Sequence, residues 1–231
     1  MTSVSAHRNK HKPDRTRDTR ERLLLTALHL YATQGLHGVS LRRIAAEAGS
    51  RNSAAMHYHF DNKLGVIRAL VKMIARELAQ LDSTLRADAK NENQTTTVKR
   101  RTSLQAGFRQ TLLPLLTLSE SQPWGSDAVH FLSRLVSDGD EEIAAMINDV
   151  YAPFWQHTDK ALASEFPDLP APVRQLRLLF MTTNVIHGMA EANWLRYPPL
   201  GDVSSFDRDA LLDHLVDYLI GGLKAPSLAA T

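Results

Sequence analysis

The stretch that decides the fold is residues 16–64, TRDTRERLLLTALHLYATQGLHGVSLRRIAAEAGSRNSAAMHYHFDNKL. Its first half predicts a helix, because apolar residues recur there at the spacing of one helical face. These residues are Leu24, Ala27, Leu28 and Tyr31. Gly35 and Gly38 are expected to end this helix, since glycine tolerates the positive φ found just beyond a helix C-terminus.

The second half of the stretch predicts two short helices. Ser40 is a favourable N-cap for the first of them, and Gly49 ends it after about two turns. Between the two, apolar residues again keep helical spacing, at Leu41, Ile44, Ala45 and Ala48. The segment SRNSAAMHYHF then predicts a second short helix with polar residues at its start. This order is typical of a helix-turn-helix, whose second short helix reads the major groove of DNA.

These residues resemble the tetracycline-repressor (TetR) family of bacterial regulators. Members typically carry Ile-Ala-x-x-Ala-Gly, then a Leu-Tyr-x-His-Phe ending, then a Lys that opens the fourth helix. The matching residues here are Ile44, Ala45, Ala48, Gly49, His59, Phe60 and Lys63. Two departures are visible: the usual Tyr falls on His57, with Tyr58 beside it, and the stretch from Gly49 to Phe60 is one residue longer than usual.

The helix-turn-helix pattern gives a set of candidate DNA contacts. Residues at the start of the recognition helix face base edges, and residues around it face phosphates. The candidates are Ser40, Arg42, Arg43, Arg51, Asn52, Ser53, Ala54, His57, Tyr58, His59 and Lys63. For each arginine, a solvated surface position is the alternative. The short His57-x-His59 spacing with no third ligand argues against a metal site.

Charge divides the chain in the same place. Residues 1–63 hold 11 Lys/Arg against 5 Asp/Glu, whereas residues 64–231 hold 16 against 20. A basic first quarter on an acidic remainder is typical of a DNA-binding head on a body that does not bind DNA. Residues 1–15 are expected to form a disordered basic arm. The chain has no cysteine, which excludes disulfides and thiol catalysis and suits the cytoplasm.

The remaining 160 or so residues predict further helices. Apolar residues keep one stripe from Ile67 to Leu81, and helical patterns follow at about 98–117, 127–137, 141–165, 171–196 and 206–223. Asp140 is a favourable helix start, Pro153 is expected to kink its helix, and Pro114 to kink or end its own. No segment alternates as a strand does, and no apolar run is long enough to cross a membrane. The fold prediction is therefore all-α, with a head at 16–64 and a helical body at 65–225.

The last two predicted helices are apolar over more of their surface than packing against one neighbour would bury. Two such helices from each of two copies can form a four-helix bundle, and the family resemblance implies the same homodimer. The candidate interface residues are Leu176, Met189, Leu212, Leu215, Val216 and Leu219. The alternative is a monomer that buries these faces internally.

The body also mixes aromatic and polar residues in the way that a site for a small lipophilic ligand does. The candidates are Phe108, His130, Met146, Tyr151, Phe154, Asn184 and His187. For any one of them, ordinary core packing is the alternative reading. No nucleophile elbow, phosphate loop or metal motif is present in the sequence, so we expect no enzyme activity, no metal and no cofactor.

The sequence thus predicts a cytoplasmic, homodimeric repressor that leaves a near-palindromic double-stranded operator when a small, mainly apolar effector binds. Two alternatives stay open. One is a helix-turn-helix protein without an effector, and the other is an α-helical enzyme or ligand carrier with a basic arm.

Overall fold

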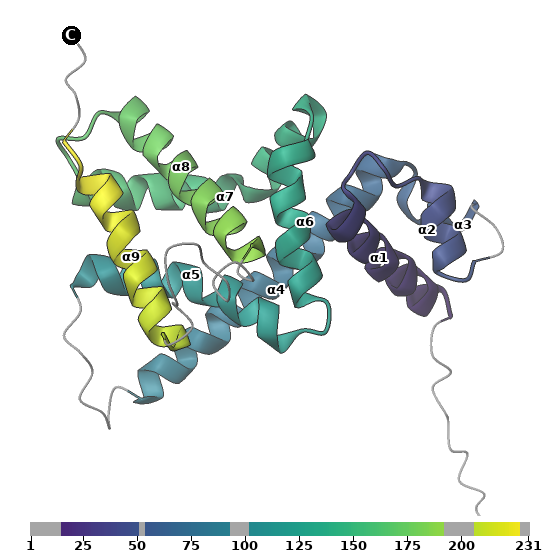
Figure 1. Cartoon of the computed structure of the whole chain (residues 1–231), viewed down its shortest axis with the longest axis horizontal. Coiled ribbons are helices and arrows are strands. Elements are labelled where there is room, and N and C mark those ends of the chain that lie inside the picture. Colours follow the sequence, from purple (N-terminus) through teal and green to yellow (C-terminus); the bar gives the residue numbers. More distant parts are fainter. Residues whose placement is uncertain (1–14, 51–53, 93–101, 192–205, 227–231) are drawn as a thin grey trace, which may run out of the picture.

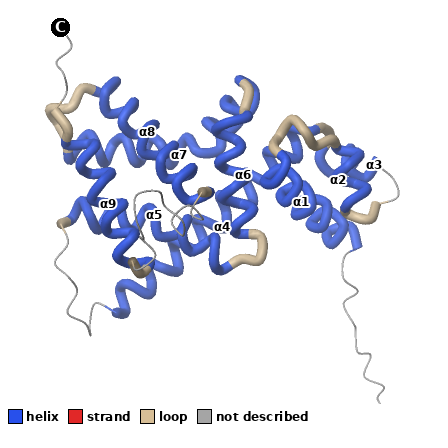
Figure 2. The backbone as a smooth tube through the Cα atoms, viewed as in Figure 1, coloured by secondary structure: helices blue, strands red, loops and turns tan. Residues whose placement is uncertain are grey.

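The computed structural model describes residues 15–50, 54–92, 102–191 and 206–226. All regular structure in these ranges is helical, which confirms the all-α prediction (Figure 2). The helices are α1 (Arg15–Gln34), α2 (Leu41–Glu47), α3 (Ala54–Phe60), α4 (Lys63–Glu92), α5 (Ser103–Ser121), α6 (Gly125–Asp138), α7 (Glu141–Glu165), α8 (Ala171–Ala190) and α9 (Arg208–Lys224). None of these helices is both long and apolar enough to span a membrane.

The helices form a small head and a larger body (Figure 1). Helices α1 to α3 lie at one end, α5 to α9 make up the rest, and α4 runs from the head into the body. One hydrophobic core is continuous across the two parts, with buried residues from α1, α4 and α6. The Tyr31 ring of α1 stacks on the Phe131 ring of α6, with 6.2 Å between centroids. The head is therefore packed firmly against α6.

Local sequence signals explain where several helices begin. Asp140 accepts a hydrogen bond from the Ile143 backbone N–H at 2.9 Å, so the predicted start of α7 is confirmed. At Thr102 a capping box with Gln105 starts α5, later than the predicted 98. Both Pro114 and Pro153 lie inside helices that continue past them, so Pro114 does not end α5.

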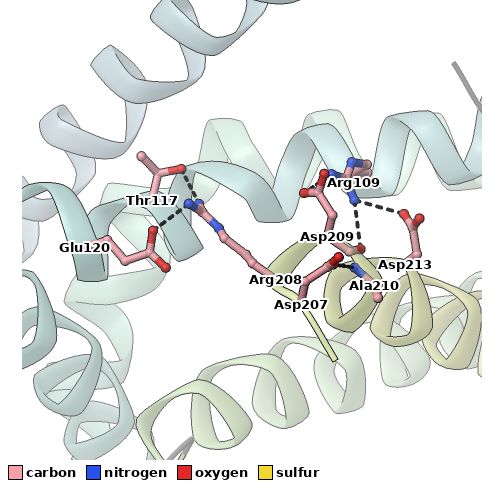
Figure 3. Close-up of polar contacts among 8 residues, drawn as sticks. All are labelled: Arg109, Thr117, Glu120, Asp207, Arg208, Asp209, Ala210 and Asp213. Carbon is pink, nitrogen blue, oxygen red and sulfur yellow. Dashed lines mark hydrogen bonds and ion pairs between the residues drawn. The ribbon is translucent and has the colours of Figure 1, made fainter. Parts of the chain in front are cut away.

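Helix α9 is fastened to α5 inside the chain. Arg109 of α5 lies between Asp209, at 2.6 Å, and Asp213, at 2.9 Å (Figure 3). Arg208, the first residue of α9, pairs with Glu120 near the end of α5 at 2.5 Å. Further along α9, Leu212, Val216 and Ile220 pack against apolar side chains of α5.

This pairing corrects part of the predicted dimer interface. Leu212, Val216 and Leu219 are at most 2% exposed, because α5 and α8 of the same chain already cover them. Met189 and Leu215 are half-buried against the same packing. Of the six residues predicted for the interface, Leu176 is the one that is plainly exposed, at 49%.

Candidate nucleic-acid interface

Helix α2 is held at both ends by the residues that the sequence singled out. The Ser40 hydroxyl accepts a hydrogen bond from the Arg43 backbone N–H at 3.2 Å, which caps the N-terminus. At the C-terminus, Gly49 has φ of +70°, a conformation that glycine adopts without strain. The turn closes when the Ser50 N–H donates to the Ala45 carbonyl at 2.8 Å. The α2–α3 connection is therefore a defined turn up to Ser50.

Helix α3 turns one face to the core and the other to solvent. Met56 and Phe60 are buried in the hydrophobic core, whereas Tyr58 is 77% exposed. Ala54 and His57 are also exposed, and His59 is half-buried. A short helix anchored by two apolar residues, with its polar side free, can enter a groove without losing its own packing.

The turn from α3 into α4 fixes the angle of α3. Asp61 adopts the left-handed conformation, with φ of +60°, and its carbonyl lies 2.7 Å from Nδ1 of His57. Next to it, the Asn62 side chain accepts a hydrogen bond from the Gly65 backbone N–H at 2.8 Å and so caps α4. Gly65 has no room for a side chain, because a Cβ there would collide with the carbonyl oxygen of Phe60.

Arg20 of α1 supports α3 from the other side. Its guanidinium carbon lies 5.1 Å from the centroid of the Phe60 ring, a cation–π distance. Burial lowers the pKa of the neighbouring His59, and the positive charge of Arg20 lowers it further. The neutral form of His59 is thus favoured beside Arg20. No local pattern in the sequence singles out Arg20, because its partner lies forty residues away and only the fold brings the two together.

The structure places the predicted DNA contacts as follows. Ser40, Arg42 and Arg43 are exposed around the start of α2. Arg51, Asn52 and Ser53 lie outside the described residues. Together with the outward side of α3, the exposed residues form a polar surface at the end of the head, away from α9 (Figure 1). We call this surface the recognition face: Ser40, Arg42, Arg43, Ala54, His57 and Tyr58.

Lys63 is placed differently from the prediction of a phosphate contact. Its ammonium nitrogen lies 5.9 Å from the centroid of the Tyr31 ring, and it lines a narrow crevice with His37 and Asp140. Burial lowers the pKa of Lys63, and the Asp140 carboxylate opposes that shift. In this conformation Lys63 joins head to body instead of lying on the recognition face.

The seven residues predicted for a ligand site are not gathered in one place. Phe108 packs between α5 and α9, whereas Phe154 is 41% exposed and stacks edge-on with Trp155. Asn184 is exposed on α8 and bonds the Phe180 carbonyl of its own helix. These three residues lie outside the hydrophobic core cluster that contains Met146 and Tyr151.

The remaining four candidates come from α6, α7 and α8. Met146 is buried, and Tyr151 packs against the same core. The Tyr151 hydroxyl is fully buried and has no hydrogen-bond partner among the described residues, and burial raises its pKa to about 12. His187 of α8 contacts Ser133 of α6 through Nδ1 at 2.7 Å, while His130 bonds the Ser126 carbonyl.

Comparison with known families agrees with this arrangement. A family model described as "Bacterial regulatory proteins, tetR family" matches residues 23–70. A second model, "Tetracyclin repressor-like, C-terminal domain", matches residues 109–222. The first match covers the helix-turn-helix and the start of α4, and the second runs from α5 to α9. A search among curated proteins finds no match.

Solved structures share the fold at low sequence identity. The fatty acid degradation regulator FadR from Bacillus halodurans is 17% identical, with a TM-score of 0.57 over 94% of this chain and 99% of that chain. NalD, the secondary repressor of the MexAB-OprM multidrug efflux pump in Pseudomonas aeruginosa, is 20% identical, with a TM-score of 0.55 over 90% and 96%. A putative TetR-family regulator from Rhodococcus sp. is 15% identical, with a TM-score of 0.56 over 90% and 99%.

Two models of one family match successive parts of the chain, and the geometry of the head agrees with them. The chain belongs to the TetR family of bacterial regulatory proteins and is a DNA-binding transcriptional regulator, of a family whose members are regulators and not enzymes.

Proposed function

We propose that this regulator is a repressor that binds a near-palindromic operator as a homodimer and leaves it when a small, mainly apolar effector binds the body. The observation that carries this proposal is the continuous core between head and body. Since α1 and α6 share that core, a shift of α6 changes the position of the head. A ligand that prefers an arrangement in which the heads are wrongly spaced for the operator lowers DNA affinity, and DNA then lowers ligand affinity by the same factor.

For the dimer, the proposal rests on the exposed apolar side of α8. Leu176, Leu179 and Phe180 are 49%, 60% and 56% exposed and share one side of the helix by their spacing. On the neighbouring helix α9, Tyr218 is 65% exposed. Large apolar side chains exposed in this way are commonly covered by a partner. We name Leu176, Leu179, Phe180 and Tyr218 the dimer face. A two-fold pair would offer two α3 helices to major grooves about 34 Å apart.

For the effector, the proposal rests on Tyr151. A buried hydroxyl without a partner costs about 1–3 kcal/mol, so a ligand that supplies an acceptor there gains affinity. Apolar neighbours in the same core include Met146 and Ile186, and the next residue on α8 is His187. We therefore propose that an effector inserts between α6, α7 and α8, with its polar atom on Tyr151.

The experiment that tests this function has two stages. Selection of duplexes from a random pool gives the operator, and sedimentation of the complex gives its stoichiometry. Compounds that raise the melting temperature are then titrated into the complex. Two protomers on a near-palindrome, released by a stabilising lipophilic compound, support the proposal. A single protomer on an asymmetric site would overturn the dimer, and stabilising compounds that never release DNA would overturn the inducer. Such a regulator acts where the DNA is, so we propose a cytoplasmic location.

A further inference from the structure

A cleft opens where α1, α4 and α7 meet, between the head and the body. Its volume is 460 Å³, within the range of small-molecule sites. Its lining residues are Arg20, Ala69, Lys72, Ala75, Arg76, Ala79 and Val150. None of the residues assigned above to the recognition face, the dimer face or the effector site is among them.

The charge of the cleft is of one sign. Arg20, Lys72 and Arg76 line it, and no carboxylate is among the lining residues. Within the described part of the chain, none of these three side chains forms an ion pair. Arg76 uses its Nε on the Lys72 carbonyl, at 3.2 Å, and Arg20 contacts the Phe60 ring. Three like charges that line one cleft repel one another, and an anion between them offsets that repulsion.

The other residues that line the cleft are apolar and have small side chains. Ala69, Ala75 and Ala79 of α4 present methyl groups along the cleft, and Val150 of α7 faces them. Small side chains leave room for a slender apolar chain, whereas hydrogen-bonding groups for a sugar or a base are missing from this wall. A cleft lined by three cations and by small apolar side chains therefore matches an amphiphile with a charged head.

We propose that this cleft binds a small organic anion, with a carboxylate or phosphate head on Arg20, Lys72 and Arg76 and an unbranched apolar tail along the alanines of α4. Charge-assisted hydrogen bonds to guanidinium groups hold the head, and burial of the tail adds to them. Because the three cations are exposed to water, each contributes modestly, and the affinity falls with salt.

Arg20 links this site to the recognition helix. The same guanidinium that lines the cleft lies over Phe60, the last residue of α3. An anion in the cleft competes with the Phe60 ring for Arg20, and so changes the support of α3 from behind. The anion consequently alters DNA affinity without touching DNA. This last step rests on the proposed function, whereas anion binding itself does not.

Binding is tested by calorimetry on the full-length protein at low salt, with octanoate, octyl phosphate, octanol and inorganic phosphate as probes. We expect either octyl anion to bind at least about tenfold tighter than octanol or inorganic phosphate, because head and tail both contribute. The stronger of the two octyl anions identifies the head group. Equal binding of octanol would reduce the cleft to an apolar groove, and equal binding of inorganic phosphate would reduce it to a basic patch. Either result, or no binding at all, overturns the proposal.

Variants locate the site. Arg76→Gln and Lys72→Gln should each weaken octyl-anion binding about two- to fivefold, whereas Arg134→Gln, an exposed arginine of α6 outside the cleft, should leave it unchanged. Equal losses in all three would show general charge attraction and overturn the proposal. A separate titration of the anion into the operator complex tests whether anion binding at Arg20 changes DNA affinity. Binding without any change of DNA affinity would remove that step and leave the anion site standing.

Discussion

The carboxylate of Asp138, in α6, accepts a hydrogen bond from the Leu36 backbone N–H, in the turn after α1, at 3.2 Å. In the same turn, Nε2 of His37 donates to the Asp138 carbonyl at 2.9 Å. Gly35 completes the turn with φ of +78°, and a Cβ there would lie 2.9 Å from the Asp138 carboxylate. The last residue of α6 thus shapes the turn that leads into α2, which gives the body a direct hold on the helix-turn-helix.

Replacing Asp138 with Ala should loosen this hold. The free energy of unfolding should fall by about 1–2 kcal/mol, because the Leu36 N–H loses its acceptor in a part-buried place. Hydrogen exchange at the Leu36 amide should accelerate as well. Urea denaturation and exchange rates measure the two effects. Asp149→Ala, at an exposed position of α7, is the control. Unchanged exchange at Leu36 would show that the contact does not hold the turn.

Gly65→Ala should damage the α3–α4 turn. The new methyl group meets the Phe60 carbonyl, so backbone must shift, at a cost of about 1–3 kcal/mol. DNA affinity should fall with it, since the angle of α3 changes. The matched control is Gly107→Ala in α5, where a Cβ meets open space and a helical alanine should stabilise by about 0.5–1 kcal/mol. Equal thermal stability of the two variants would contradict the role given to Gly65.

Arg43→Ala should weaken binding to all DNA sequences about equally, because an exposed arginine beside the cap of α2 is placed for a phosphate. The slope of log affinity against log salt should fall by about 1. By contrast, replacing Asn52 or Ser53 should change the preferred sequence, as expected for the start of a recognition helix. Fluorescence anisotropy at several salt concentrations measures both, with Arg134→Ala as control. A change of sequence preference in the Arg43 variant would assign that residue to a base.

Leu179→Glu should convert the dimer into a monomer that stays folded. The side chain is 60% exposed in the single chain but would be buried in a dimer, where an unpaired carboxylate costs several kcal/mol. Sedimentation gives the mass, and circular dichroism checks the fold. Val136→Glu, at an exposed apolar position of α6, is the control. A persistent Leu179→Glu dimer would place the interface elsewhere. Leu219→Glu should unfold the protein instead, because that residue of α9 is buried against α5, α7 and α8 of the same chain.

Tyr151→Phe should stabilise the protein without ligand by about 1 kcal/mol at neutral pH, since a buried hydroxyl without a partner is removed. It should also change the alkaline pH dependence. Burial raises the pKa of Tyr151 from 10.0 to about 12, so the folded state keeps the proton longer than the unfolded state does. The contribution of the protonated Tyr151 hydroxyl to the free energy of unfolding is fully present below pH 10 and is lost as the pH rises towards 12.

Denaturation of Tyr151→Phe from pH 8 to pH 11 should therefore show a shallower loss of stability than the parent protein. Tyr58→Phe, which changes an exposed ring of α3, should follow the parent. If both variants lost stability equally with pH, Tyr151 would not be the buried phenol that titrates. Lower effector affinity in the same variant would support its proposed contact with the ligand.

Much of the head was predictable because its signals are local. In the head, Ser40 marks the start of α2 and Gly49 follows its end, and in the body Asp140 caps the start of α7. Such caps and left-handed glycines depend only on neighbours within a few residues. The spacing of apolar residues likewise predicted the run of helices and the all-α class. Such features depend on backbone hydrogen bonds and helical period, which the sequence displays directly.

Position in space was not predictable in the same way. Helical spacing shows which side of α9 is apolar, but it does not show whether α5 or a second copy covers Leu212 and Val216. It places Asn184 on an apolar helix, yet that side chain is exposed. It places Lys63 at the start of α4, yet that side chain lies over the Tyr31 ring and lines a crevice with Asp140. The sequence by itself determined the helices and the recognition motif, because those follow from local backbone chemistry. The tertiary structure decided which faces meet, because packing depends on contacts between residues far apart in the chain.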